Sequence, residues 1–393
     1  MNILSGLSYE QIYVINSIKK ICILKNIDAY IVGGAVRDAL LNAKVRDIDI
    51  CVTKDPKLIV ESLEEIKEFK YYSEFQTASV EFKRGVSIDI IRCRREFYPE
   101  YGTLPKIIPS DINHDLFRRD FTINALAYDL KYYKLIDLYG GIGDIKNKLI
   151  RKIHSNSYEE DPTRVFRAIK YSIRYKFLLY DRDEIISCAS KGIFKTISND
   201  RIAKEISLLC TEKNWKDAFL LFARLNIFDL NCNLIGKSNP VVNYDHVNIR
   251  LLNLFYSFKD KRDADILVDN SIMDSDLKKS MMQLKNIDVE NFLKETIDNY
   301  EIFRQLKNMS RYELAYLSWN FKLTYKIYNY IYNLKDCILC INGNKVKDFG
   351  IKDGKSVGSI LRYIKKLKLN TGIEKDLNRR DIQNALEYKD RKF

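Results

Sequence analysis

The sequence predicts an α+β fold, in which a head with a small mixed sheet is followed by an all-α remainder. Before about residue 140, short runs rich in β-branched residues alternate with segments of helical periodicity. After that point, nearly every segment repeats its apolar residues at intervals of three and four. The chain of 393 residues is too long for one compact domain, so we expect roughly two to four domains.

The head begins with a predicted helix over residues 7–25, for which Ser8 is the expected N-cap. Four predicted strands follow, in the runs AYIVGG (29–34), RDIDICV (46–52), ASVEFKRG (78–85) and VSIDIIR (86–92). The last two runs are so close in the chain that they fit a hairpin and not a crossover. A further helix is predicted from Thr122 onward, because charged residues precede an apolar stripe there.

The helical remainder contains predicted helices over 158–175, 198–210, 215–225, 247–258 and 289–303. Segment 97–114, which contains three prolines, is predicted as a loop. We therefore divide the chain into a head over residues 1–140 and three helical parts, over 141–210, 211–300 and 301–393.

The charge of the chain favours a polyanionic partner. The formal net charge is +13 at pH 7. Codon bias offers an alternative source for some of it, since the chain is rich in Lys, Ile, Asn and Tyr, which AT-rich codons encode. The distribution is more informative, because residues 341–393 hold 14 Lys and Arg against 7 Asp and Glu, a net charge of +7.

Other patterns restrict the class of protein. The sequence has no run of 18 apolar residues, so we expect no membrane-spanning helix. The stretch MNILSGLSYEQIYV lacks a basic region followed by an apolar block, so we expect no signal peptide. The scattered cysteines favour the reducing cytoplasm. Cys337 and Cys340 form a C-x-x-C without a second pair, and we interpret them as helix residues and not as zinc ligands.

The double glycine at Gly33 and Gly34 is the first motif with chemical meaning. It ends a predicted strand and precedes a helix, so backbone N–H groups there form an anion site suited to a triphosphate. Arg37 follows on the first turn of that helix and is expected to reach the same anion. A Gly-Gly turn of purely structural value is the alternative.

Three aspartates predict a metal site. Asp47 and Asp49 are two residues apart on one predicted strand, so their side chains point to the same face. Two carboxylates on one face repel each other unless a cation lies between them, and hard oxygen ligands suit Mg²⁺. Asp89 lies in a second strand that can pair beside the first. Three carboxylates on adjacent strands match the two-metal arrangement for in-line phosphoryl transfer.

The segment DLFRRDFTINALAYD (115–129) predicts contacts with a nucleotide. Asp120 and Asn124 are one helical turn apart, and their shared face suits a ribose hydroxyl. An arginine beside them, Arg119, suits a phosphate. A charged helix start with a favourable N-terminal aspartate is the alternative interpretation.

The segment YEEDPTRVFRAIKYSIRYKF (158–177) predicts recognition of a base. Asp161, Arg164 and Arg167 follow at intervals of three along one side of a helix. An aspartate accepts and an arginine donates in planar geometry, so the pair can copy the edge of a partner base without a nucleic-acid template. A surface ion pair that contributes less than about 1 kcal/mol is the alternative.

The order of these segments resembles the class II tRNA nucleotidyltransferase and bacterial poly(A) polymerase family. The matching segments are GGAVRD…DID, IDIIRCRREFY, RRDFTINALAYD, DLYGGIGDIKNKLIR, EEDPTRVFRAIKYSIRYKF and ISNDRIAKEI, in collinear order within residues 28–210. The segment INGNKVKDFGIKDGKSVGSILRYIKKL is similar to the C-terminal segment of one branch. The chain departs from the family pattern at residues 42–43, 170–171 and 199–201, and none of these departures removes a catalytic carboxylate.

The resemblance implies a polymerase-β-type nucleotidyltransferase head with a helical neck, body and tail. It implies template-independent addition of nucleotides to a tRNA 3′ end, with CTP and ATP as substrates and two Mg²⁺ ions as cofactor. Asp47 and Asp49 would bind metal with help from Asp89. By the same resemblance, the residues that contact the nucleotide would be Arg119, Asp120 and Asn124. The residues that recognise the base would be Asp161 and Arg164, with Arg167 nearby.

The expected product is the complete CCA end. Segment 97–114 corresponds to the flexible loop that helps the family switch from C to A, so its presence favours CCA over CC-only addition. A-adding, CC-adding and poly(A)-adding enzymes stay open as alternatives, as does a non-catalytic RNA-binding protein on the same scaffold. Lys352 and Lys355 in the basic C-terminal part are expected to grip tRNA phosphates. We expect no protein partner.

Overall fold

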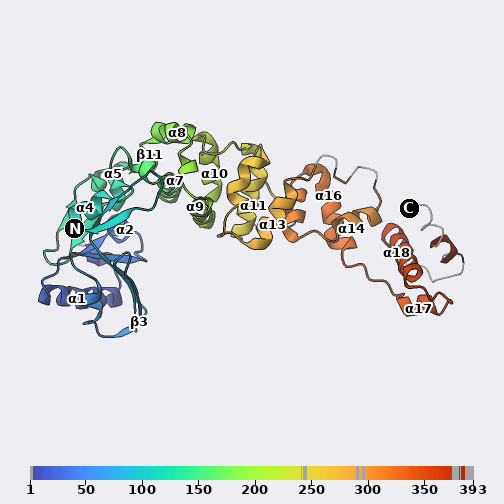
Figure 1. Ribbon diagram of the computed structural model, residues 1–393, viewed down its shortest axis with the longest axis horizontal. Coiled ribbons are helices and arrows are strands. Elements are labelled where there is room, and N and C mark those ends of the chain that lie inside the picture. The colour runs from blue at the N-terminus through green and yellow to red at the C-terminus, as the bar shows by residue number, and fades with distance from the viewer. Residues whose placement is uncertain are drawn as a thin grey trace. The chain divides into compact units, whose positions relative to one another are not determined.

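The computed structural model describes residues 3–239, 241, 246–288, 292–293, 297–373, 380 and 382–385 (Figure 1). The chain forms two compact units. The first consists of Met1–Leu230 with Asn270–Ile272, and the second of Asn231–Asp269 with Met273–Phe393. The finer division at residues 140, 210 and 300 stays a prediction.

The first unit is built on a seven-stranded mixed sheet, as the sequence predicts. The strand order is β3-β4-β5-β2-β1-β8-β9, with β2 and β5 parallel and the other neighbours antiparallel. The strands are β1 (Ala29–Val32), β2 (Ile48–Val52), β3 (Ile66–Tyr72), β4 (Thr77–Phe82), β5 (Ser87–Arg92), β8 (Leu126–Asp129) and β9 (Leu135–Asp137). The predicted hairpin between 78–85 and 86–92 is confirmed as the antiparallel pair β4–β5.

One face of this sheet carries the main hydrophobic core. Three helices contribute apolar side chains to it, namely α1 (Tyr9–Leu24), α2 (Gly34–Leu40) and α3 (Lys57–Val60). The predicted cap of α1 is confirmed, because Ser8 Oγ accepts a hydrogen bond from the Gln11 N–H and the Gln11 side chain accepts one from Ser8. Ile48 and Ile50 are buried in this core, so Asp49 between them points to the opposite face.

The opposite face of the sheet is covered only in part. Ile112 and Leu116 of α4 (Ile112–Phe117) pack there against Tyr30, Val32 and Cys51 in a smaller apolar cluster. Since Asp49 lies on this face beside that cluster, the polar chemistry of the head is expected on the remaining part of it.

The helix predicted from Thr122 onward is wrong. Thr122–Asn124 form a single 3-10 turn, and the chain continues as strand β8 between β1 and β9. Residues 125–127 are completely buried. A strand that is covered on both faces is apolar throughout, so its sequence lacks the alternation that separates a strand from a helix.

Segment 97–114, predicted as a loop, contains regular structure. Strand β6 (Arg94–Phe97) pairs antiparallel with β7 (Lys106–Pro109), and the chain then enters α4. Only residues 98–105 connect the two strands. Pro109 is tolerated because it ends β7 in a two-stranded ribbon, where a missing N–H group is not costly.

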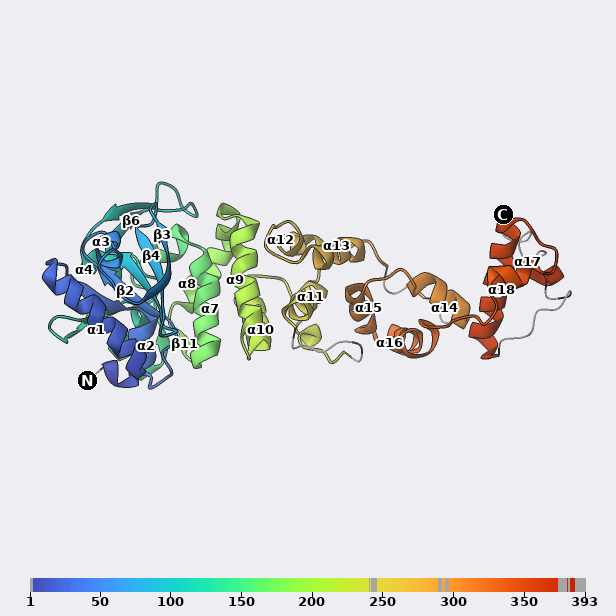
Figure 2. The same ribbon diagram turned by 90° about the horizontal axis from the view of Figure 1, so that it is seen from below.

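The remaining helices of the first unit follow the sheet. Helices α7 (Thr163–Tyr175), α9 (Asn199–Thr211) and α10 (Trp215–Arg224) pack against one another (Figures 1 and 2), and the last two confirm the predictions over 198–210 and 215–225. The helix predicted over 158–175 is interrupted, because α6 (Ser157–Glu160) ends before Pro162. The smaller elements are α5 (Gly141–Asn147), α8 (Arg182–Ser190), β10 (Leu149–Ile150) and β11 (Leu178–Leu179).

The regular elements among the described residues of the second unit are all helices. Its α-helices are α11 (Val247–Ser257), α12 (Asp265–Val268), α13 (Ser275–Leu284), α14 (Asn299–Leu306), α15 (Arg311–Ser318), α16 (Phe321–Asn329), α17 (Gly343–Lys347) and α18 (Gly354–Thr371). The prediction over 247–258 is confirmed by α11. Of the helix predicted over 289–303, residues 289–291 and 294–296 lie outside the described residues, and α14 begins at Asn299.

The interpretation of Cys337 and Cys340 as helix residues is wrong. Both follow the π-helical segment Tyr330–Leu334 and lie in the connection to α17, whose N-cap is Asn342. Neither cysteine forms a disulfide bond.

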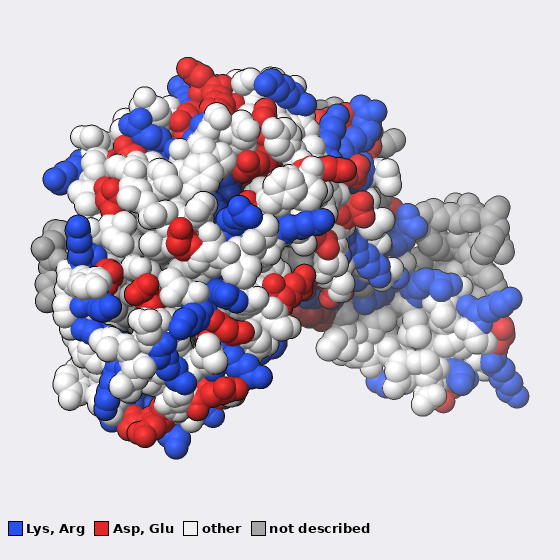
Figure 3. Space-filling model, turned by 60° about the vertical axis from the view of Figure 1, so that its left-hand side comes forward, with Lys and Arg blue, Asp and Glu red and all other residues white. Residues whose placement is uncertain are grey.

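The surface carries both signs of charge. Basic and acidic side chains are interspersed over the face shown in Figure 3. Among the described residues, we find no helix whose length and apolar character would let it cross a bilayer.

Candidate active site

A cavity of about 950 Å³ opens in the first unit, and we call it the main cavity. Its volume falls within the range of ligand-binding pockets, roughly 300–1,000 Å³. The predicted head and neck residues that line it are Gly33, Gly34, Arg37, Asp47, Asp49, Arg119, Asp120, Asn124, Asp161, Arg164 and Arg167. The structure therefore brings the Asp-x-Asp pair and the predicted base-reading aspartate to one cavity, although Asp49 and Asp161 are 112 positions apart in the chain. Asp89 is not among the residues that line this cavity.

The double glycine forms a close-packed turn at the edge of the main cavity. Gly33 has a φ of +67°, a backbone conformation that favours glycine. A Cβ atom at this position would lie 2.6 Å from Arg119 Nη1, so a side chain would collide with the guanidinium group. The backbone conformation of Gly33 therefore favours glycine, and a side chain there would displace the Arg119 guanidinium group. The predicted contact of Gly33 with a triphosphate stays a prediction.

Arg37 is held on several sides. Its Nη1 donates to Asn124 Oδ1 at 2.5 Å and its Nε donates to Asp38 Oδ1 at 2.8 Å. Its guanidinium also lies over the rings of Tyr171 and Tyr175, at 5.3 and 4.8 Å from the ring centroids. Because the two tyrosines belong to α7, Arg37 joins the head to that helix.

The carboxylates of β2 and β5 concentrate negative charge. Asp49 and Asp89 are register neighbours on parallel strands, and their side chains share the sheet face that holds the main cavity. Burial raises the pKa of the Asp49 carboxyl, Arg119 opposes this, and the charges of Asp89 and Asp47 raise the pKa further. This surplus of negative charge on a half-buried group fits a cation.

The described residues contain no group of three or more His, Cys, Asp or Glu side chains arranged closely enough to hold a metal ion. Of the predicted ligands, Asp49 and Asp89 are register neighbours, whereas Asp47 precedes β2 and is related to Asp49 by charge; the three are not a preformed triad. Their assignment as metal ligands stays a prediction.

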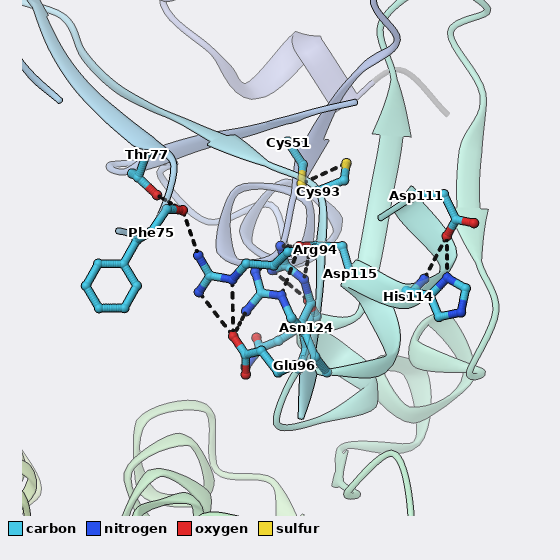
Figure 4. A network of polar contacts seen from close by, with 12 residues as sticks. Cys51, Phe75, Thr77, Cys93, Arg94, Glu96, Asp111, His114, Asp115 and Asn124 are labelled. Atoms are coloured by element: carbon cyan, nitrogen blue, oxygen red, sulfur yellow. Dashed lines mark hydrogen bonds and ion pairs between the residues drawn. The ribbon is translucent and has the colours of Figure 1, made fainter. Parts of the chain in front are cut away.

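A ladder of arginines and carboxylates borders the Asp49 side of the main cavity (Figure 4). Glu96 Oε1 accepts from Arg94 Nη2 at 3.1 Å and from Arg118 Nη1 at 3.0 Å. Asp115 accepts from Arg118 Nη2 and from Arg119 Nη2, each at 2.9 Å. Three guanidinium groups thus share two carboxylates, so the ladder carries a net positive charge suited to phosphates.

Asp115 is a positioning residue that the sequence analysis did not single out. Its side chain is completely buried, which opposes ionisation, but Arg118 and Arg119 overcome this and hold the pKa at about 2. A sequence signal was present, since Asp115 precedes the two arginines by three and four residues, and α4, which holds Asp115, ends just before them.

Asp120 connects the head to α7. Its Oδ1 accepts from Asn124 Nδ2 at 2.9 Å, and its Oδ2 accepts from Arg167 Nε at 2.8 Å. Burial disfavours the charged carboxylate, but Arg167 and Asn124 hold its pKa at about 2. The expected pairing of Asp120 with Asn124 is therefore present without the predicted helix. Both carboxylate oxygens have protein partners, and the predicted contact of Asp120 with a nucleotide stays a prediction.

Asp161 and Arg164 line the main cavity, and the Arg164 backbone N–H donates to the Asp161 carbonyl at 3.0 Å. Asp161 Oδ1 accepts from Thr163 Oγ1 at 2.6 Å. Arg164 is only 4% exposed, and it donates through Nη1 to Ser157 Oγ at 2.7 Å and through Nη2 to the Arg118 carbonyl at 2.9 Å. These contacts fix both side chains in orientation, as recognition of a flat base requires.

Arg201 of α9 is a second positioning residue that the sequence analysis did not assign to the site. Its Nη2 donates to Asp161 Oδ1 at 2.8 Å and its Nη1 donates to the Gly102 carbonyl at 2.5 Å. Arg201 thereby joins the β6–β7 connection to the predicted base-reading aspartate. No local pattern could reveal this, because its partners lie 40 and 99 residues away in the chain.

The predicted RNA contacts Lys352 and Lys355 belong to the second unit. Lys352 precedes α18, and Lys355 lies in the first turn of that helix; both are exposed. Helices α17 and α18 share a small apolar core that includes Val346 and Ile360. The two lysines are therefore presented by a packed helix pair.

Comparisons with known proteins show what this chain is similar to. Residues 29–151 match the family described as "Poly A polymerase head domain". The chain is 30% identical over 372 residues to the A-adding tRNA nucleotidyltransferase of Aquifex aeolicus, covering 87% of this chain and 45% of that protein. It is 27% identical to the CCA-adding enzyme of Lactobacillus helveticus, covering 88% of this chain and 90% of the relative. The chain thus spans less than half the length of the Aquifex relative and nearly all of the Lactobacillus one.

The fold also matches a solved structure. The Thermotoga maritima CCA-adding enzyme complexed with tRNA_CCA aligns with a TM-score of 0.71 and 23% identity, covering 99% of this chain and 98% of that one. Identity at this level shows a common fold, which agrees with the α+β head and helical remainder described above.

Proposed function

We propose that this protein, whose residues 29–151 match the poly A polymerase head-domain family, adds nucleotides to the 3′ end of tRNA without a template. The single observation that carries the proposal is the convergence of Asp47, Asp49 and Asp161 on the main cavity. A site for phosphate chemistry and a site for base selection then share one space. The proteins of Aquifex and Lactobacillus named above have such activities by name, and this supports the same class of activity here.

The proposed reaction joins the RNA 3′-oxygen to the α-phosphorus of CTP or ATP. The bond from that phosphorus to the pyrophosphate breaks, pyrophosphate leaves, and the hydroxyl proton passes to solvent. The net positive charge of the ladder formed by Arg94, Arg118 and Arg119 would offset charge that develops on the phosphates.

Asp47 and Asp49 would hold two Mg²⁺ ions, with Asp89 beside them. When bound, these ions lower the pKa of an attacking hydroxyl and stabilise the leaving pyrophosphate. The residues fit the ions because Asp49 is half-buried next to two further carboxylates, which disfavours its charge in the absence of a cation.

Asp161 and Arg164 would select the incoming base, with Arg167 nearby. Hydrogen bonds from paired acceptors and donors discriminate between bases by about 1–3 kcal/mol. The fixed orientations of Asp161 and Arg164 support this role, since a side chain held by two partners loses little freedom on binding. Gly33, Gly34 and Arg37 would meet the triphosphate, and Lys352 and Lys355 would meet tRNA phosphates.

The proposed product is the complete CCA end. Addition of A alone or of CC alone remains the alternative, because similar proteins carry the names A-adding, CC-adding and CCA-adding. A poly(A) polymerase and a non-catalytic RNA-binding protein are further alternatives.

One experiment tests the proposal and separates its alternatives. Three tRNA transcripts, ending before CCA, after C and after CC, are incubated with Mg²⁺ and with CTP, ATP or both, and the products are sized. A CCA-adding enzyme extends all three to one length when both nucleotides are present. An A-adding enzyme extends only the CC transcript, a poly(A) polymerase gives long products, and no extension of any transcript contradicts the proposal.

A further inference from the structure

A second, smaller cleft adjoins the main cavity, and we call it the side cleft. Its volume is about 240 Å³. It is lined by Tyr72, Phe75, Thr77, Ile91, Arg94 and Arg118, and the last three of these residues also line the main cavity. The two spaces therefore adjoin at these three side chains, and a chain bound in the main cavity can reach towards the side cleft.

The side cleft presents aromatic surface in a fixed position. Tyr72 ends β3 and Phe75 lies in the turn to β4, and their side chains are 40% and 42% exposed. The Phe75 carbonyl accepts hydrogen bonds from Thr77 Oγ1 at 3.2 Å and from Arg94 Nη1 at 3.3 Å. Figure 4 shows the Phe75 ring pointing away from these contacts. The turn is thus anchored through its backbone while the ring stays available.

The register of the sheet links this aromatic surface to the carboxylates. Tyr72 pairs with Thr77, and Thr77 pairs with Ile91, so these three residues form a row across β3, β4 and β5. Ile91 is two residues beyond Asp89, so both side chains lie on one face of the sheet. The row therefore runs along the face that carries Asp49 and Asp89.

The geometry of an in-line transfer indicates which part of the substrates lies nearest the side cleft. Gly33 directly follows β1, which flanks β2 on one side, whereas β5 and then β4 flank β2 on the other. If the triphosphate lies at Gly33, the leaving pyrophosphate lies on the β1 side of Asp49. An in-line attack then brings the acceptor hydroxyl from the β5 and β4 side, where the side cleft is.

We propose that the side cleft binds the 3′-terminal nucleoside of the acceptor RNA, with its base stacked on Phe75 and Tyr72. This inference rests on the proposed nucleotidyl transfer. Every base has a π-face, so aromatic stacking accepts a terminal base of any identity. That tolerance suits a site in which the terminal nucleoside changes after each addition.

The test uses Phe75→Ala and Phe75→Leu, with Tyr132→Ala as matched control. Tyr132 is an exposed tyrosine on another turn of the sheet, and it lies outside both clefts. The KM for a tRNA transcript and the KM for CTP are measured separately, with an intact transcript and with one that is abasic at its 3′-terminal nucleotide. Phe75→Leu keeps an apolar side chain of similar bulk, so it separates stacking from folding.

The expected result is a rise of about fivefold or more in the KM for intact RNA in both Phe75 variants, with the KM for CTP unchanged. For the wild-type protein, the KM for the abasic transcript should exceed the KM for the intact transcript by a similar factor. For the Phe75 variants, the two KM values should differ little. An unchanged KM for RNA, or equal losses on intact and abasic transcripts, would overturn the inference.

Crosslinking provides a readout that does not depend on catalysis. A transcript with 4-thiouridine at its 3′ end is irradiated with the full-length protein, and the crosslinked peptide is mapped. A crosslink to residues 72–77 supports the inference even when no nucleotide is added to the transcript. The missing addition would contradict the proposed function but not the binding site. Incorporation accompanied by a crosslink elsewhere would overturn the inference and leave the proposed function intact.

Discussion

Arg167 of α7 donates from Nε to Asp120 Oδ2 at 2.8 Å, and this contact ties the predicted base-reading helix to the head. Asp120 also accepts from Asn124, whose own Oδ1 accepts from Arg37. One buried carboxylate therefore connects the segment after the glycine turn, through Asn124 and Arg37, to the predicted base-reading helix. Because Asp120 contacts both Asn124 and Arg167, we expect its substitution to affect stability and nucleotide binding.

Replacing Asp120 by Asn removes the charge and keeps the size of the side chain. We expect the unfolding free energy to fall by about 1–3 kcal/mol, because Arg167 loses its charged partner in a buried setting. We also expect the KM for nucleotide to rise. Urea unfolding and steady-state kinetics measure the two effects. Asp183→Asn, at an exposed position on α8, is the control and should change neither. A stability equal to that of the wild type would show that the Asp120 contacts contribute little.

Acid should unfold the first unit through Asp115. The pKa of Asp115 is held at about 2, below its ordinary value of 3.8, so its stabilising contribution is complete above pH 4 and is lost as the pH falls towards 2. The loss amounts to about 2 kcal/mol. Urea unfolding at pH 5, 4 and 3 measures it. Asp115→Asn should be less stable at pH 7 and should show a smaller loss towards pH 3. If the unfolding free energy of both proteins had the same pH dependence, Asp115 would not be the source of the loss.

Substitution of Arg201 should change nucleotide selection, although Arg201 does not line the main cavity. Arg201→Ala releases Asp161 from one of its donors and frees the Gly102 carbonyl of the β6–β7 connection. We expect kcat/KM to fall roughly tenfold, which corresponds to about 1.4 kcal/mol. The ratio of kcat/KM for CTP to that for ATP should also shift.

Arg201→Lys serves as the companion variant, because it keeps one charge but cannot bridge two acceptors in planar geometry. It should lie between the wild type and Arg201→Ala. If both variants keep the wild-type CTP-to-ATP ratio, Arg201 has a structural role only.

The basic C-terminal part, residues 341–393, should contribute to RNA affinity through its charge. If Lys352 and Lys355 each contact a phosphate, Lys352→Ala/Lys355→Ala should lower the slope of log K against log salt by roughly 1.4–1.8, at about 0.7–0.9 per contact. Fluorescence anisotropy with a labelled tRNA at several salt concentrations measures the slope. Lys57→Ala/Lys83→Ala removes the same charge from exposed positions of the head and should leave the slope unchanged. A slope that falls equally in both double variants would show that net charge alone is responsible.

Local patterns in the sequence were sufficient to predict much of the fold. The N-cap at Ser8, the β4–β5 hairpin and the orientation of Asp49 away from Ile48 and Ile50 follow from spacing and alternation over a few residues. The helix predicted from Thr122 failed because a strand buried on both faces carries no alternation.

Most of the predicted head and neck residues line the main cavity, although Asp89 does not, and the contacts between them could not be predicted. Spacing and resemblance indicated Asp120, Asp161 and Arg167, yet the partners of these residues depend on how distant segments pack. Arg201 could not be assigned to Asp161 from sequence, because its contacts span 40 and 99 residues. Which side chains orient the others is therefore decided by tertiary structure.

The central claim is that Asp49 and its neighbouring carboxylates drive nucleotide transfer in the main cavity. The most direct test is incorporation of labelled CTP by Asp49→Asn into a tRNA transcript lacking CCA, with tRNA binding measured on the same preparation. We predict that incorporation falls by at least about a hundredfold while the Kd for tRNA changes by less than about twofold. Incorporation close to that of the wild type would contradict the account.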